Sequence, residues 1–83
     1  MSVKIRILNP APETYLATED GTLELRLQAT GKSMPHWFLN GKYLGQFTER
    51  LHRFRPGVYT IRAVSENTEE LSDRTEFTIS GKP

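Results

Sequence analysis

The chain has 83 residues, of which 36% are hydrophobic and 25% are charged, as expected for one small globular domain. Eleven basic and ten acidic residues give a net charge of +1, which argues against a general nucleic-acid binder. The absence of cysteine excludes disulfides and thiolate metal sites, and no apolar run is long enough to insert into a membrane.

The first half of the chain reads as strands joined by turns. Apolar and basic residues alternate over residues 3–7, which predicts a half-buried strand ended by the prolines of residues 9–12. A long connection over 13–21 follows, in which residues 15–17 are expected to form a short edge strand. Residues 22–29 give the clearest strand, with four apolar side chains alternating with polar ones.

The strongest local signal is the run from His36 to residue 45, which holds the only tryptophan. Asn40 and Gly41 lie between two apolar runs, and both tolerate the positive φ that a two-residue hairpin turn requires. Strands over 36–39 and 42–45 are therefore predicted. Trp37 should point to one face with Leu39, and Phe38 to the other.

The second half contains two further strands and a less regular segment. Residues 49–54 place Leu51 and Phe54 at different parities, so a bulge or bend is expected there. A turn at 55–57 precedes a strand over 58–64. Residues 65–73 are expected to form a polar, acidic loop, and a final strand covers 74–80.

About seven short strands at this spacing predict an all-β, immunoglobulin-like antiparallel sandwich formed by residues 1–83 as one domain. Leu25, Trp37 and Ile61 fall where that fold builds its core, and Leu39 shares the parity of the tryptophan. The run Gly57-Val58-Tyr59 matches the corner in which a tyrosine hydroxyl bonds back to the chain, so Tyr59 is assigned a structural role.

The segments just described resemble a known family, the C-terminal domain of bifunctional penicillin-binding proteins of the C class. The most specific part is Trp-Phe-Leu-Asn-Gly at residues 37–41. The other parts are the Ile-x-x-Pro strand at 7–10, the leucine-rich strand at 23–29, the Pro-Gly-x-Tyr-x-Ile strand at 56–61 and the last strand at 75–79. The resemblance covers nearly the whole chain, but the loop at 65–73 is longer and more acidic than the family's glycine-containing turn.

The resemblance implies a setting rather than an activity. Such a domain ends a membrane-anchored peptidoglycan synthase in the periplasm, whose preceding domains carry the glycosyltransferase and transpeptidase chemistry. On this basis the chain is expected to be a noncatalytic domain excised from a longer envelope protein, located in the periplasm and working without a cofactor.

The residues themselves give no catalytic constellation. His36 and His52 are the only histidines, and nothing in their spacing indicates a metal site. The acidic residues of 65–73 lack the regular spacing and glycine of a calcium loop, so a solvated turn is the favoured interpretation; these residues are Glu66, Glu69, Glu70 and Asp73. A small hydrolase is the least favoured reading, because no nucleophile turn is recognisable.

Two groups of residues are candidates for a contact surface. Arg50, Arg53 and Arg55 form a local basic cluster that would suit an acidic partner or would simply protect an edge strand. Phe38 and Tyr43 are the second group, because Phe38 lies on the face opposite Trp37 and marks a contact surface if it is exposed. The preferred hypothesis is binding to another protein or to the enzyme's own catalytic domains, and the alternative is a module that binds peptidoglycan.

Overall fold

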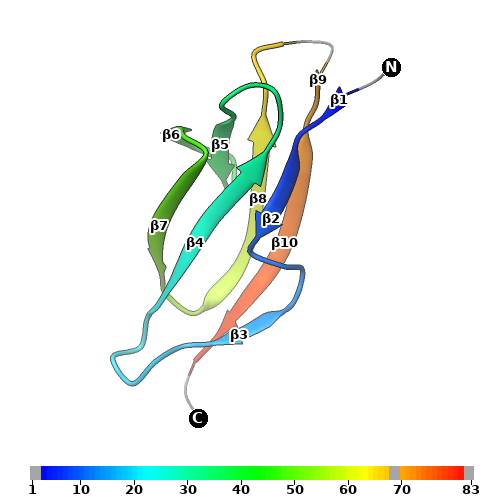
Figure 1. Cartoon of the computed structure of the whole chain (residues 1–83). Helices are drawn as coiled ribbons and strands as arrows, with labels where there is room; N and C mark the ends of the chain where they lie inside the picture. Colours follow the sequence, from blue (N-terminus) through cyan, green and yellow to red (C-terminus); the bar gives the residue numbers. More distant parts are fainter. Residues whose placement is uncertain (1–2, 68–69, 82–83) are drawn as a thin grey trace.

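A computed structural model describes residues 3–67 and 70–81, and in this part of the chain every regular element is a β-strand. The two main sheets pack face to face as a β-sandwich 47 Å long and less than 20 Å across. Figure 1 shows the layer of β2, β4 and β7 in front of β5 and β8. The expected all-β, immunoglobulin-like fold is confirmed.

One sheet has five strands in the order β3-β10-β8-β5-β6. Its strands are β3 (Thr14–Leu16), β5 (His36–Leu39), β6 (Lys42–Gln46), β8 (Gly57–Val64) and β10 (Asp73–Ser80). All neighbours are antiparallel except β3, which runs parallel to β10 at the edge. The short edge strand expected near residue 15 is therefore present.

The other main sheet has three strands in the order β2-β4-β7, all antiparallel. These are β2 (Arg6–Asn9), β4 (Leu23–Thr30) and β7 (Glu49–Phe54). A small parallel pair, β1 (Val3–Lys4) with β9 (Glu70–Leu71), lies at one end of the molecule (Figure 1). The first predicted strand is thus interrupted at Ile5, which lies between β1 and β2. The Ile5 side chain is fully buried in the core.

The core lies between the two sheets and contains residues from almost every strand. Trp37 and Ile61 are fully buried, as is Leu27. Leu25, Leu39 and Tyr59 are partly buried and pack against this cluster. The most buried leucine of β4 is therefore Leu27 and not Leu25, which the sequence predicts to be in the core. The C-terminal half of β4 is the part that crosses the core.

Trp37 is held by a residue outside any strand. Its ring stacks on Phe47 at a centroid distance of 5.2 Å and an interplanar angle of 6°, and its Nε1–H donates to the Phe47 carbonyl at 2.7 Å. The guanidinium carbon of Arg50 lies over the Phe47 ring, 4.1 Å from its centroid. The core tryptophan is thus closed off from solvent by an aromatic ring and then by a cation.

Two predicted backbone features have their expected geometry. Asn40 has φ 49° and Gly41 has φ 82°, and the Asn40 side chain accepts a hydrogen bond from the Thr60 amide at 2.8 Å. The Tyr59 hydroxyl donates to the Arg55 carbonyl at 2.7 Å, which closes the corner at the start of β8. Both features tie a turn to a neighbouring strand.

Two expectations about the second half were wrong. β7 pairs with β4 at six consecutive positions without a bulge, so Leu51 simply points outward while Phe54 points into the core. The loop at 65–73 is not a plain solvated turn, because Glu70 lies in β9 and is 5% exposed. Glu69 lies outside the described residues.

Candidate functional site

The two outer faces of the sandwich differ in character. The outer face of the three-stranded sheet carries five charged side chains, namely Arg6, Glu24, Arg26, Glu49 and Arg53, with two exposed leucines, Leu8 and Leu51. The outer face of the five-stranded sheet also carries charged side chains, but it alone adds aromatic rings, Phe38 and Tyr43, to the exposed or half-exposed Leu16, Val58 and Val64. A contact surface is therefore sought on the five-stranded sheet.

The aromatic pair lies at the β6 edge of this sheet. Phe38 and Tyr43 are direct cross-strand neighbours, and their ring centroids are 5.3 Å apart with an interplanar angle of 52°. Phe38 is half-buried, whereas Tyr43 is 52% exposed. The hairpin turn at Asn40 and Gly41 sets this register, so the turn residues place the aromatic pair.

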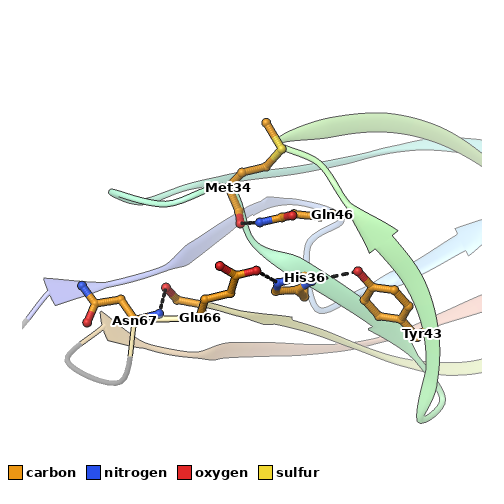
Figure 2. A network of polar contacts seen from close by, with 7 residues as sticks. Met34, His36, Tyr43, Gln46, Glu66 and Asn67 are labelled. Atoms are coloured by element: carbon orange, nitrogen blue, oxygen red, sulfur yellow. Dashed lines mark hydrogen bonds and ion pairs between the residues drawn. The ribbon is translucent and has the colours of Figure 1, made fainter.

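A polar network holds the exposed ring in place, and Figure 2 shows His36 between its two partners. The Tyr43 hydroxyl lies 2.8 Å from Nδ1 of His36, and Nε2 of the same imidazole lies 2.8 Å from Oε1 of Glu66. The loop after β8 supplies Glu66, while β5 and β6 supply the other two residues. We call Phe38, Tyr43, His36 and Glu66 the hairpin cluster.

The hairpin cluster does not have the surroundings of a catalytic site. Glu66, His36 and Tyr43 form a carboxylate–imidazole–hydroxyl chain, an arrangement that in some enzymes activates a nucleophile. However, the Glu66 side chain is 69% exposed and Tyr43 is half exposed, so water screens the charges that a reaction would develop. Among residues 3–67 and 70–81, no three His, Asp or Glu side chains are placed to hold a metal ion. The arrangement can orient an aromatic ring for contact.

The predicted basic cluster is divided between the two faces of β7. Alternation along the strand turns Arg50 toward Phe47 and the core edge, where its Nη1 also donates to the Leu44 carbonyl at 3.2 Å. Arg53 points to the outer face and Arg55 follows the strand, both exposed. The three arginines therefore do not form one anion-binding patch.

His52 lies on the same side of β7 as Arg50. Its ring packs against Phe54 with the ring centroids 4.7 Å apart and the planes tilted by 58°. Burial, and then the charge of Arg50, lower the pKa of His52 below its ordinary value. The imidazole is therefore neutral at pH 7, and its role is packing at the rim of the core.

Glu70 joins two loops at the end of the molecule that holds β9. Its Oε2 accepts a hydrogen bond from the Lys32 amide at 2.7 Å. The Ser65 hydroxyl, and then that amide, lower the pKa of the Glu70 carboxyl. This buried carboxylate clamps the loop after β4 to the loop after β8.

Sequence reasoning missed three of the residues that shape this end of the molecule. The sequence places Phe47 among the aromatic residues near the hairpin but gives it no place in the core, and Glu66 and Glu70 looked like ordinary acidic loop residues. A sequence gives no signal for contacts such as Glu66 to His36, since thirty residues separate them. His36 alternates with Trp37 along the strand, and this parity indicates a position facing solvent or a covering loop; Glu66 comes from such a loop.

Comparison with known proteins supports the fold. No family model matches the chain, and no curated protein matches it. Among solved structures the chain is similar to titin domain M7, with a TM-score of 0.61, 17% identity, and coverage of 100% of this chain and 98% of that one. It is also similar to a chain of the complex of titin M10 with an obscurin-like 1 Ig domain, with a TM-score of 0.58, 18% identity, and coverage of 99% and 96%.

A third similar structure is the titin Ig tandem A164-A165, with a TM-score of 0.54 and 18% identity. There the match covers 99% of this chain and 51% of the tandem, the length of one domain of two. At these identities the likeness establishes the immunoglobulin fold alone. In the described part of the chain, no helix could cross a membrane.

Proposed function

We propose that this chain is a noncatalytic interaction module that binds a protein partner through the outer face of its five-stranded sheet. The proposal rests on one observation: the Tyr43 side chain is half exposed, yet its hydroxyl is held by a hydrogen bond to His36. Glu66 fixes the same imidazole from the other side. Phe38 supports the ring from the neighbouring strand.

A ring held in this way suits protein recognition. Binding normally costs the entropy of immobilising contact side chains, about 0.5–1.5 kcal/mol for each flexible one. In the hairpin cluster the Tyr43 side chain is already ordered in the free protein, so binding loses less side-chain entropy. Tyrosine also offers apolar area and a polar tip at once, which is why it is common at interfaces.

The test is a binding titration of the isolated chain with a candidate partner, read by calorimetry. Tyr43→Ala should weaken binding by about 2 kcal/mol, as for an interface hot spot. His36→Ala should weaken binding less, because the Tyr43 ring remains and loses only the hydrogen bond that orients it. Leu8→Ala, an equally exposed residue on the other sheet, is the matched control. A Tyr43→Ala variant that binds as tightly as Leu8→Ala would remove the proposal.

We further propose that the partner is a cell-wall synthase, with this domain at its periplasmic C-terminal end. The support is the resemblance of residues 37–41, and of the strands around them, to the C-terminal domain of penicillin-binding proteins of the C class. The first partner to titrate is therefore the catalytic region encoded upstream. A natural gene without a transpeptidase upstream would contradict this setting while leaving the contact surface intact.

Peptidoglycan is the second candidate ligand, since exposed aromatic rings can stack on sugars. The tilt of 52° between Phe38 and Tyr43 means that the two rings do not form one flat platform, which favours a protein ligand. Sedimentation with purified sacculi separates the two ideas. Strong retention that is lost in Phe38→Ala and Tyr43→Ala would favour the glycan.

A further inference from the structure

Strand β7 is an open edge of the three-stranded sheet. The strand order β2-β4-β7 leaves one of its sides unpaired within the described residues, and Figure 1 shows it as the outermost strand of its layer. Only Phe47 and Thr48 join β6 to β7, and two residues are too few to place another strand along that side. Six residues in regular extended geometry are thus presented at the edge.

The backbone groups that face this edge can be assigned from the pairing with β4. Ala29 donates its amide to the Thr48 carbonyl at 3.2 Å, so the pair 29 and 48 is a hydrogen-bonded one. Because such pairs alternate along an antiparallel ladder, residues 50, 52 and 54 turn their N–H and C=O groups toward β4. The backbone groups of Glu49, Leu51 and Arg53 therefore point outward.

We propose that two copies of this chain associate by pairing their β7 strands antiparallel, with Leu51 opposite Leu51 of the second copy. The outward-facing residues must pair with one another, and this register is the one that uses all three of them. It places Glu49 opposite Arg53 of the second copy, and by two-fold symmetry it does so twice. The two three-stranded sheets then become one continuous six-stranded sheet.

The side chains along this edge favour that register. Leu51 is 54% exposed at the centre of the strand, so the pairing covers an apolar side chain with its own copy. Shifting the register by two residues would set Leu51 opposite Glu49 or Arg53 of the second copy, so the leucine contact and both Glu49–Arg53 pairs would be lost. On the inner side Arg50 faces His52 of the second copy, which is uncharged at neutral pH because its pKa is lowered. The site is on the other sheet from the hairpin cluster and does not rest on it.

Sedimentation equilibrium of the whole chain over a concentration series tests the proposal. An interface of one strand pair is small, so association is expected only toward concentrations of about 0.1–1 mM. Glu49→Lys and Arg53→Glu each turn both ion pairs into like-charge pairs, and each should weaken association by about tenfold. An equimolar mixture of the two variants should recover association, because opposite charges then meet at both positions.

The recovery by mixing distinguishes a lost interface from a misfolded variant. Arg74→Glu and Glu76→Lys are matched controls, since this exposed ion pair lies on β10 of the other sheet and carries the same charges. Both controls should associate like the unchanged chain. A chain that stays monomeric throughout the series, or one whose association is unaffected by the two β7 variants, would overturn the proposal. Failure of the mixture to associate would overturn the register.

Discussion

Replacing Phe47 by alanine should remove much of the stability of this domain. The ring is 7% exposed and stacks against Trp37 on one side, while Arg50 covers its other side. Removing it leaves a cavity beside the largest residue of the core. The hydrogen bond from Trp37 to the carbonyl of residue 47 uses the backbone and survives the change, so the loss is one of packing.

The magnitude follows from the site and from the size of the chain. Truncating a buried phenylalanine to alanine costs about 3–5 kcal/mol. A domain of 83 residues has a total stability of about 4–12 kcal/mol, so the variant loses a large share of it. Phe47→Leu keeps most of the volume and should cost about 1 kcal/mol.

Urea unfolding followed by the fluorescence of Trp37 measures this directly, since it is the only tryptophan. With a slope of about 1 kcal/mol per molar urea, the midpoint should fall by about 3 M or more. Phe38→Ala is the matched control, because that ring lies half-buried on the outer face and should cost about 1 kcal/mol. Equal losses for Phe47→Ala and Phe38→Ala would refute the assignment of Phe47 to the core.

Other positions give smaller, separable effects. Tyr59→Phe deletes the hydroxyl that closes the corner but keeps the packed ring, so unfolding free energy should fall by about 1 kcal/mol; an unchanged urea midpoint would contradict this. Gly31→Ala sets a Cβ 2.7 Å from the Glu70 carboxylate, so its melting temperature should fall, whereas Gly81→Ala meets only ordinary contacts and should melt unchanged. Hydrogen bonds from Thr18, and then from Thr22, lower the pKa of Asp20 to about 2. The stabilisation from Asp20 should therefore be complete above about pH 4 and lost as the pH falls through 2, and Asp20→Asn should flatten that part of the pH profile, measured by urea unfolding.

The fold could be predicted because its signals are local. Period-two patterns located β4, β8 and β10 to within one residue at each end, and the Asn40-Gly41 pair located the central hairpin. These patterns state which side chains face inward, and in a two-layer sandwich that information nearly defines the architecture. The regular β7 strand was mistaken for a bulged one because Leu51 was assumed to be buried, although an exposed leucine at an open edge is ordinary.

The contacts that shape the candidate surface could not be predicted in the same way. His36 bonds to Glu66 because β5 pairs with β8 in the register that sets His36 opposite Val64, which brings the start of the next loop beside the imidazole, and neither segment alone encodes that pairing. The same is true of Phe47, which closes the core from a two-residue link. Such contacts depend on how the loops pack, whereas periodicity reports only the face of a strand.

The loop contact made by Glu70 can be tested through the pH dependence of stability. Its folded-state pKa is lowered by Ser65 and by the Lys32 amide, so its contribution to stability is present above the unfolded-state pKa and is lost as the pH falls through the folded value. In Glu70→Gln the neutral amide replaces an acceptor oxygen with a donor, so this variant should be less stable than the unchanged chain at pH 7. The two should converge in acid, where Glu70 itself becomes neutral, when unfolding free energies are measured by urea from pH 7 to pH 2. A difference that stays constant over that range would mean that the charge of Glu70 does not clamp the loops, and that its packing alone holds them.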